Sequence, residues 1–159
     1  MDTMWNEIQP GLWLGGTPDD EWLGGPVAWD RGSVERDGRP FDAVVTLFGL
    51  AEPFGWEVEE LRYGFADGPV DDLDLDAVRR CAAWAHERWQ EGKRVLVRCQ
   101  AGWNRSGLVM ALVLVMAGWE PAVAVALLRE RRSPNVLCNR EFERWVIEHG
   151  GSAVEHASV

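Results

Sequence analysis

The sequence of 159 residues has no hydrophobic run long enough to cross a membrane. Its longest apolar stretch, from Leu108 to Ala117, has about half of the roughly 20 residues that a membrane-spanning helix needs. The first residues, from Met1 to Glu7, carry acidic rather than basic side chains, and no apolar segment follows them as it would in a signal peptide. We therefore expect a cytoplasmic protein with no export signal and no membrane partner.

Cysteine is also scarce, because the sequence contains only Cys81, Cys99 and Cys138. An odd number of widely spaced cysteines does not form the framework of a disulfide-rich protein, and none of them has the Cys-x-x-Cys spacing of a zinc site. We expect a reducing compartment and no metal or other cofactor.

Basic residues are fewer than acidic ones, 16 against 26, and the formal net charge is -10. Proteins that hold nucleic acids or anionic membranes by general electrostatics need a basic surface, so neither is expected as a partner. Any site for an anion must therefore be built locally. The sequence gives no indication of an oligomeric state.

The order of the predicted elements indicates an α/β fold in a single domain over residues 1–150, followed by a short tail over 151–159. Apolar and β-branched runs predict strands over 8–16 with a turn at Pro10-Gly11, over 43–48, over 95–97 and, less clearly, over 61–65. Helical periodicity and capping residues predict helices from Asp74 or Asp76 to Gly92 and over 105–117, 121–131 and 139–149. A short helix through Trp22 and Leu23, capped by Thr17 or Asp19, and a loop over 24–40 complete the prediction.

The segment from Val95 to Gly107 combines a strand, a tight loop and a helix start, and this arrangement binds anions. Backbone amides of such a loop can point inward, and the first turn of the helix adds unpaired N–H groups. Gly102 supplies the left-handed conformation that the loop needs, and Arg105 can grip two phosphate oxygens with its planar guanidinium group. We predict a phosphate site formed by Gln100, Ala101, Gly102, Trp103, Asn104 and Arg105.

Cys99, at the start of this loop, is the predicted nucleophile. A thiol that faces a helix N-terminus and a guanidinium group loses its proton more easily than an isolated thiol. Attack of the thiolate on phosphorus would divide the hydrolysis of a phosphate ester into two steps through a phosphocysteine. Ser106 would donate a hydrogen bond to the sulfur and ease its departure in the second step. The alternative is an inert buried cysteine beside a surface arginine.

A second pair with the same spacing, Cys138 and Arg144, lacks the other features of the site. No glycine lies between the two residues, Trp145 stands where a hydroxyl side chain is needed, and the run is typical of a helix. We interpret Cys138 as structural. Cys81 falls on a predicted helix and is interpreted as a packing residue, although a regulatory disulfide with Cys99 stays open.

The run from Cys99 to Ser106 resembles the Cys-x5-Arg-Ser/Thr signature loop of the protein tyrosine phosphatase superfamily, and its Cys-x-Ala-Gly form resembles the dual-specificity branch. The segment from Ile8 to Gly15 resembles the opening strand motif of that family, and the segment from Arg132 to Asn135 resembles one that follows the signature helix. The resemblance implies a mixed, mainly parallel sheet flanked by helices. It also implies hydrolysis of phosphate monoesters, with a phosphorylated protein or small phosphoester as substrate, phosphotyrosine first and phosphoserine or phosphothreonine as further candidates.

The resemblance further implies a general acid, an aspartate on a mobile loop upstream of the nucleophile. Asp67, which precedes Cys99 by 32 residues, has the matching position, and Asp71 and Asp72 are alternatives because acidic residues before a helix also act as caps. The family usually has histidine directly before the nucleophile, whereas this sequence has Arg98. We expect histidine to be tolerated at that position.

Two other functions stay open on the sequence alone. A phosphate-binding relative without catalytic activity would use Arg105 and not Cys99. A sulfurtransferase of the rhodanese type would also place a cysteine in a cradle-shaped loop. The Asp67 and Ser106 side chains favour the phosphatase over both.

Overall fold

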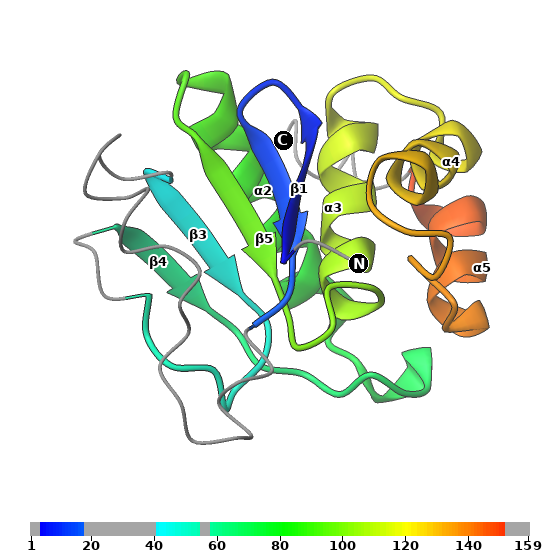
Figure 1. Cartoon of the computed structure of the whole chain (residues 1–159). Helices are drawn as coiled ribbons and strands as arrows, with labels where there is room; N and C mark the ends of the chain where they lie inside the picture. The colour runs from blue at the N-terminus through cyan, green and yellow to red at the C-terminus, as the bar shows by residue number, and fades with distance from the viewer. Residues whose placement is uncertain (1–3, 18–40, 55–57, 152–159) are drawn as a thin grey trace.

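A five-stranded sheet forms the centre of the computed structural model, which describes residues 4–17, 41–54 and 58–151 (Figure 1). The strands lie in the order β1-β2-β5-β3-β4. β1 pairs with β2 in the antiparallel direction, and the other three pairs are parallel. Their bounds are β1 (Trp5–Gln9), β2 (Leu12–Gly15), β3 (Ala43–Thr46), β4 (Glu59–Arg62) and β5 (Val95–Arg98). The predicted α/β class and the mixed, mainly parallel sheet are confirmed.

The strand at one edge of the sheet, β4, begins and ends earlier than the sequence predicts. It covers Glu59–Arg62 rather than 61–65, because its pairing with β3 ends where Thr46 meets Arg62. Its first two residues are glutamates, and charged residues are unusual in a strand. Both find arginine partners here: Glu59 binds Arg88, and Glu60 binds Arg98.

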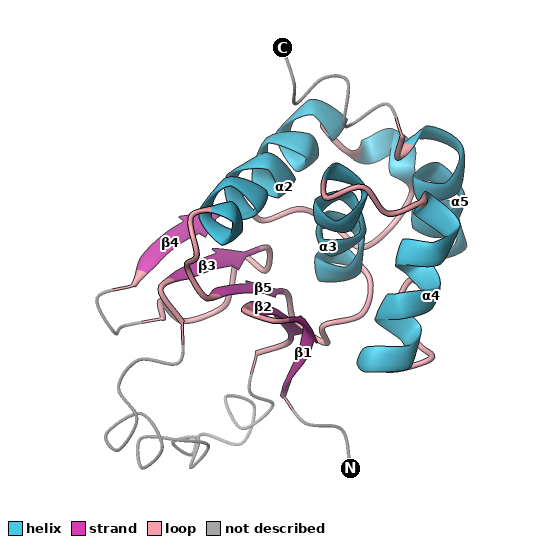
Figure 2. Ribbon diagram, turned by 90° about the horizontal axis from the view of Figure 1, so that it is seen from above, coloured by secondary structure: helices cyan, strands magenta, loops and turns pink. Residues whose placement is uncertain are grey.

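Four α-helices of the described chain lie on one side of the sheet, with α5 packed on α3 and α4 (Figure 2). They are α2 (Leu75–Gln90), α3 (Arg105–Met116), α4 (Pro121–Arg131) and α5 (Arg140–His149), with a short 3-10 helix, η2 (Val70–Asp72), before α2. Asp74 is the cap of α2, since its carboxylate accepts a hydrogen bond from Ala77 N at 3.1 Å. All four match predicted helices. The predicted helix through Trp22 and Leu23, the loop over 24–40 and the tail after Gly151 lie outside the described residues.

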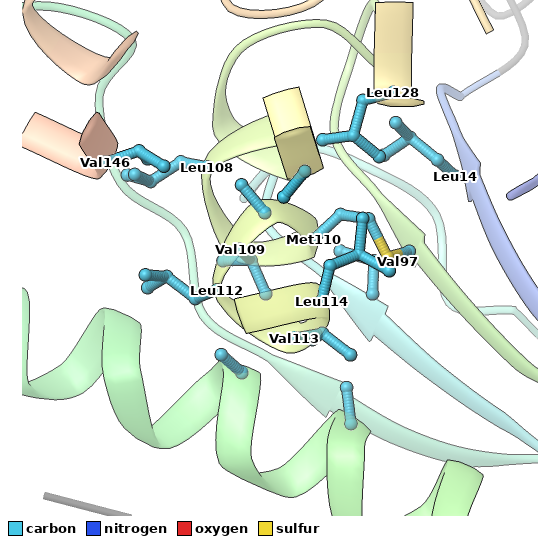
Figure 3. Close-up of a cluster of buried hydrophobic side chains, with 14 of the residues drawn as sticks. Leu14, Val97, Leu108, Val109, Met110, Leu112, Val113, Leu114, Leu128 and Val146 are labelled. Carbon is cyan, nitrogen blue, oxygen red and sulfur yellow. The ribbon is translucent and has the colours of Figure 1, made fainter. Parts of the chain in front are cut away.

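The hydrophobic core is built around α3. Every residue of this helix from Ser106 to Val115 is buried, as expected for a helix that is apolar on all sides. In Figure 3 its side chains project in all directions, toward Val146 of α5 on one side and Leu14 and Val97 of the sheet on another. A smaller cluster on the opposite face of the sheet contains Phe41, Val44, Phe54 and Leu96. None of the described helices combines the length and apolar character that crossing a bilayer requires.

Candidate active site

The signature loop, residues 99–104, connects the end of β5 to the start of α3 (Figure 1). β5 is the central strand and pairs with β2 on one side and β3 on the other, both in parallel. Ligand sites of parallel sheets lie beyond the carboxyl ends of the strands. The loop is therefore held where a ligand is expected, between a fixed strand and a fixed helix.

The thiol of Cys99 points into this loop and is 2% exposed. Its Sγ lies 3.1 Å from Ser106 Oγ and accepts a hydrogen bond from Gly102 N at 3.3 Å. Cys99 N donates to Gly15 O at 3.2 Å, which fixes the nucleophile candidate to the end of β2. Ser106 is completely buried, so its hydroxyl is held against the sulfur. The structure thus places the Ser106 hydroxyl at the sulfur, as the sequence predicts, and adds a hydrogen bond from the loop amide of Gly102.

Glycines allow the signature loop to pack directly on the end of β2. Gly102 has a φ of +79°, and a Cβ there would lie 2.5 Å from Gly15 C. A Cβ on Gly16 would lie 2.4 Å from Gln100 O, and Thr17 N donates to that same oxygen at 2.9 Å. Any side chain at position 102 would therefore be strained and would also collide with backbone. The prediction of a left-handed glycine at this position is confirmed.

Arg132 supports the loop from outside, a role that sequence reasoning missed. Its Nε donates to Gly102 O at 2.8 Å and its Nη2 donates to Ala101 O at 3.1 Å. Its Nη1 donates to Asn6 Oδ1 at 2.8 Å, so the same side chain reaches β1. The family-like segment that begins at Arg132 was the available signal, but the sequence does not show which backbone groups the arginine meets.

The guanidinium group of Arg105 is only partly satisfied by the protein. Its Nη1 donates to Phe65 O at 3.4 Å, and its Cζ lies over the ring of Phe48, 5.2 Å from the ring centroid. Its Nε is buried and has no hydrogen-bond partner among the described residues. A buried donor without a partner costs about 1–3 kcal/mol, so this group is suited to receive an anionic ligand.

Asp67 lies beside the loop and is held by two side-chain amides. Asn104 Nδ2 donates to Asp67 Oδ2 at 3.0 Å, and Asn139 Nδ2 donates to Asp67 Oδ1 at 2.9 Å. The alternatives Asp71 and Asp72 are exposed in η2, and neither side chain accepts a hydrogen bond within the described part of the chain. The geometry therefore favours Asp67 as the acid next to the loop.

Arg98 points away from Cys99, since neighbouring side chains of a strand alternate between the two faces. It is 4% exposed; its Nε donates to Thr46 Oγ1 at 3.0 Å and its Nη2 donates to Glu52 O at 2.7 Å. The same Nη2 lies 3.4 Å from Glu60 Oε2. A histidine is too short to make these contacts, so the structure argues against the expectation that histidine is tolerated here.

Glu60 is the acidic partner in this buried polar cluster. Burial opposes its ionisation, but hydrogen bonds from the Thr46 hydroxyl and Phe54 N, together with the charges of Arg98 and Arg62, outweigh burial and lower the pKa of Glu60. The cluster therefore consists of charged groups that stabilise one another behind the signature loop.

The other two cysteines have different environments. Cys81 is buried in α2, and burial raises the pKa of its thiol to about 11 against a smaller opposing effect of Arg80, so this thiol stays protonated at neutral pH. Cys138 is exposed and lies just before the Asn139 cap of α5, and the run that follows it is helical as the sequence predicts. Its Sγ accepts a hydrogen bond from Asn104 Nδ2 at 3.4 Å.

Comparison with known proteins points in the same direction as this geometry. A sequence model described as dual specificity phosphatase, catalytic domain, matches residues 73–152. Mouse dual specificity protein phosphatase 12 is 33% identical over 142 residues, which cover 86% of this chain and 38% of that protein. The chain thus spans well under half of the length of this relative.

Solved structures show the same fold. The structure of Tk-PTP in its active form aligns over 96% of this chain and 99% of its own, with a TM-score of 0.72 and 25% identity. Human DUSP28 aligns over 98% of this chain and 97% of its own, with a TM-score of 0.75 and 21% identity. Together with the matched catalytic-domain model, these likenesses confirm the resemblance read from Cys99 to Ser106, and the chain belongs to the dual-specificity branch of the protein tyrosine phosphatase superfamily.

Proposed function

We propose that this protein hydrolyses phosphate monoesters through a phosphocysteine intermediate, with residues 1–150 as its catalytic domain. One observation carries the proposal. The Cys99 thiol, bound by Ser106 and Gly102 N, lies in a loop followed directly by Arg105, whose buried Nε–H has no partner in the part of the chain that the structure describes. A nucleophile and an unused donor thus lie at the two ends of the same loop, and phosphoryl transfer uses both.

In the first step the Cys99 thiolate attacks phosphorus. An S–P bond forms while the bond from phosphorus to the ester oxygen breaks, and Asp67 gives its proton to that oxygen. Arg105 and the loop amides bind the other phosphoryl oxygens, whose charge changes in the transition state. The leaving alcohol or phenol then departs as a neutral molecule.

In the second step water attacks the phosphocysteine. A new P–O bond forms, the S–P bond breaks, and Asp67 accepts the proton that the water loses. The Ser106 hydroxyl, 3.1 Å from Cys99 Sγ, donates a hydrogen bond to the departing sulfur. Inorganic phosphate is released and the thiolate is restored.

The side chains of the loop favour aryl phosphates, phosphotyrosine in proteins above all, with phosphoserine and phosphothreonine as further substrates. Gln100, Trp103 and Asn104 include no basic residue, whereas a polyphosphorylated head group needs several cations around it. Trp103 offers an aromatic face to a phenyl ring. All three cysteines are free thiols, which supports a reducing, cytoplasmic location.

The alternative functions, a phosphate-binding relative without catalysis and a rhodanese-like sulfurtransferase, have less support. The matched family model is that of a phosphatase catalytic domain, and Cys99, Ser106 and Asp67 are all present beside the loop. A relative that only binds phosphate would not need the thiol and its hydroxyl partner.

The test is phosphate release from phosphotyrosine and phosphoserine peptides, a phosphoinositide and a nucleotide, measured with the wild type and with Cys99→Ser. We expect release from the phosphotyrosine peptide to be fastest and to disappear in Cys99→Ser, while vanadate or phosphate binding survives. Cys81→Ser is the matched control, because that buried thiol is remote from the chemistry and should leave turnover unchanged. Substantial turnover by Cys99→Ser would overturn the mechanism.

A further inference from the structure

The loop that carries Asp67 is attached to the first turn of α5. Asn139 Nδ2 donates to Asp67 Oδ1 at 2.9 Å and to Gly68 O at 3.0 Å. Two residues further on, Val70 N donates to Glu141 Oε1 at 3.2 Å. Three hydrogen bonds therefore hold residues 67–70 against the helix. The family resemblance implies a mobile general-acid loop, but in this chain three hydrogen bonds attach that loop to the start of α5.

Asn139 also begins α5. Its Oδ1 accepts hydrogen bonds from Glu141 N at 3.1 Å and from Phe142 N at 3.3 Å, the typical contacts of a helix cap. The oxygen of one carboxamide thus starts the helix, while its NH2 group binds the acid loop. The helix is a firm support, because Phe142 is completely buried and its ring lies 6.5 Å from that of Phe65, just before the loop.

The contacts of Asn139 extend to the signature loop. Asn139 N donates to Asn104 Oδ1 at 2.9 Å, and Asn104 Nδ2 donates to Asp67 Oδ2 at 3.0 Å. Asp67, Asn104 and Asn139 therefore form a closed ring of hydrogen bonds. Each oxygen of Asp67 is held by a different element, one by the signature loop and one by α5, and this fixes the plane of the carboxyl group.

A carboxyl group held in this way can still carry a proton. Each carboxylate oxygen has two acceptor positions, and each oxygen of Asp67 uses one of them for an amide of the ring. One position per oxygen remains for the transferred proton. The ring therefore restricts the orientation of the acid without occupying the position from which it acts.

We propose that Asn139 is a positioning residue for phosphoryl transfer, which orients the Asp67 carboxyl toward the leaving oxygen at the same time as it caps α5. The inference rests on the proposed function, in which Asp67 is the general acid. Proton transfer depends on the alignment of donor and acceptor, and a displacement of about 1 Å can cost about 100-fold in rate. Loss of the two donors of Asn139 should therefore weaken the acid step specifically.

The experiment compares Asn139→Ser and Asn139→Asp with the wild type and with Asp67→Asn. Serine and aspartate are helix caps about as good as asparagine, but neither has an amide to donate. We expect both variants to keep the thermal unfolding midpoint of the wild type within about 3 °C. We expect kcat for phosphates with poor leaving groups to fall about 10- to 100-fold. Phosphates with good leaving groups, such as fluorinated phenols, should change less than about 2-fold, because they need no proton.

Asp74→Ala is the matched control, since it removes the cap of α2, away from the acid loop. It should lower the unfolding midpoint and leave the dependence of kcat on the leaving group unchanged. A merely structural role of Asn139 would give the same result as this control.

The possible failures are distinguishable. Wild-type protein that releases no phosphate would overturn the proposed function and this inference with it. If the wild type is active and Asp67→Asn shows no dependence on the leaving group, the acid role and the inference both fail. If Asp67→Asn shows that dependence but Asn139→Ser and Asn139→Asp turn over poor leaving groups at the wild-type rate, the inference alone is wrong.

Discussion

Arg98 and Arg105 lie on either side of Cys99 in the sequence, and their guanidinium groups have opposite surroundings. Arg98 is buried behind the sheet, where it binds Thr46, the Glu52 carbonyl and Glu60. Arg105 makes one long hydrogen bond, to Phe65 O, and keeps a buried Nε–H without a partner in the described structure. The protein itself satisfies the first arginine, whereas the second keeps a donor unused among the described residues, as the proposed phosphate site requires. Residue type alone does not separate a structural arginine from a functional one.

Arg105→Lys is the most direct test of the different roles given to the two arginines. Lysine cannot offer two parallel N–H groups to phosphate oxygens, so we expect kcat/KM to fall about 1,000-fold, equivalent to roughly 4 kcal/mol of transition-state stabilisation. The free energy of unfolding should not fall by more than about 1 kcal/mol, since an unpartnered buried donor does not stabilise the fold. Steady-state kinetics and urea unfolding measure the two quantities. A lower unfolding free energy together with an unchanged kcat/KM would reverse the assignment of the two arginines.

Arg98→His should have the opposite profile. It removes the arginine from a buried ion pair with Glu60 and leaves the Glu52 carbonyl without this donor, which should cost about 3 kcal/mol of unfolding free energy. The kcat/KM of the molecules that remain folded should fall less than about 10-fold, because Arg98 does not face the thiol. In the double variant Arg98→Met with Glu60→Leu, part of the stability should return, since apolar side chains need no partner. Unchanged stability in Arg98→His would contradict the role given to this cluster.

A smaller effect is expected from pH. The pKa of Glu60 is lowered in the folded protein, so its ionised form adds stability above its ordinary pKa of 4.5, and this stability is lost as the pH falls through the lower folded value. Glu60→Gln should therefore flatten the decrease in unfolding free energy on the acidic side of pH 4.5. Urea titrations at several pH values measure the slope. Asp76→Asn, at an exposed position of α2, is the control and should keep the slope of the wild type.

The sequence predicts the parts of the site that are local. Cys99, Gly102, Arg105 and Ser106 lie within one loop and one helix turn, so their spacing already determines that they meet. The strands β3 and β5 are also predictable, because each begins with three apolar residues and is buried along its whole length. β4 is harder to predict, because it begins with two glutamates, which are unusual in strands and find their arginine partners only in the folded protein.

The residues that support the site are not predictable in the same way. Arg132 binds loop carbonyls 30 and 31 residues away, and Asn139 binds Asp67 across 72 residues. Such pairs depend on how α4 and α5 pack on α3, which no local pattern reports. The direction of Arg98 is set by strand alternation, yet the partners that make the arginine structural come from β3, β4 and the segment between them.

The bond between Arg132 and Asn6 spans 126 residues, and it bears on the order in which the chain folds. Contacts between distant segments form slowly, because the intervening chain loses conformational entropy before the contact contributes any stabilising free energy. The signature loop rests on β2 and is closed by Arg132, so its final shape requires both halves of the chain. During refolding, helical circular dichroism should therefore recover before activity does. Activity is therefore expected only once folding is complete. In a partly folded chain, the Cys99 thiol would be exposed before the phosphate-binding loop has formed.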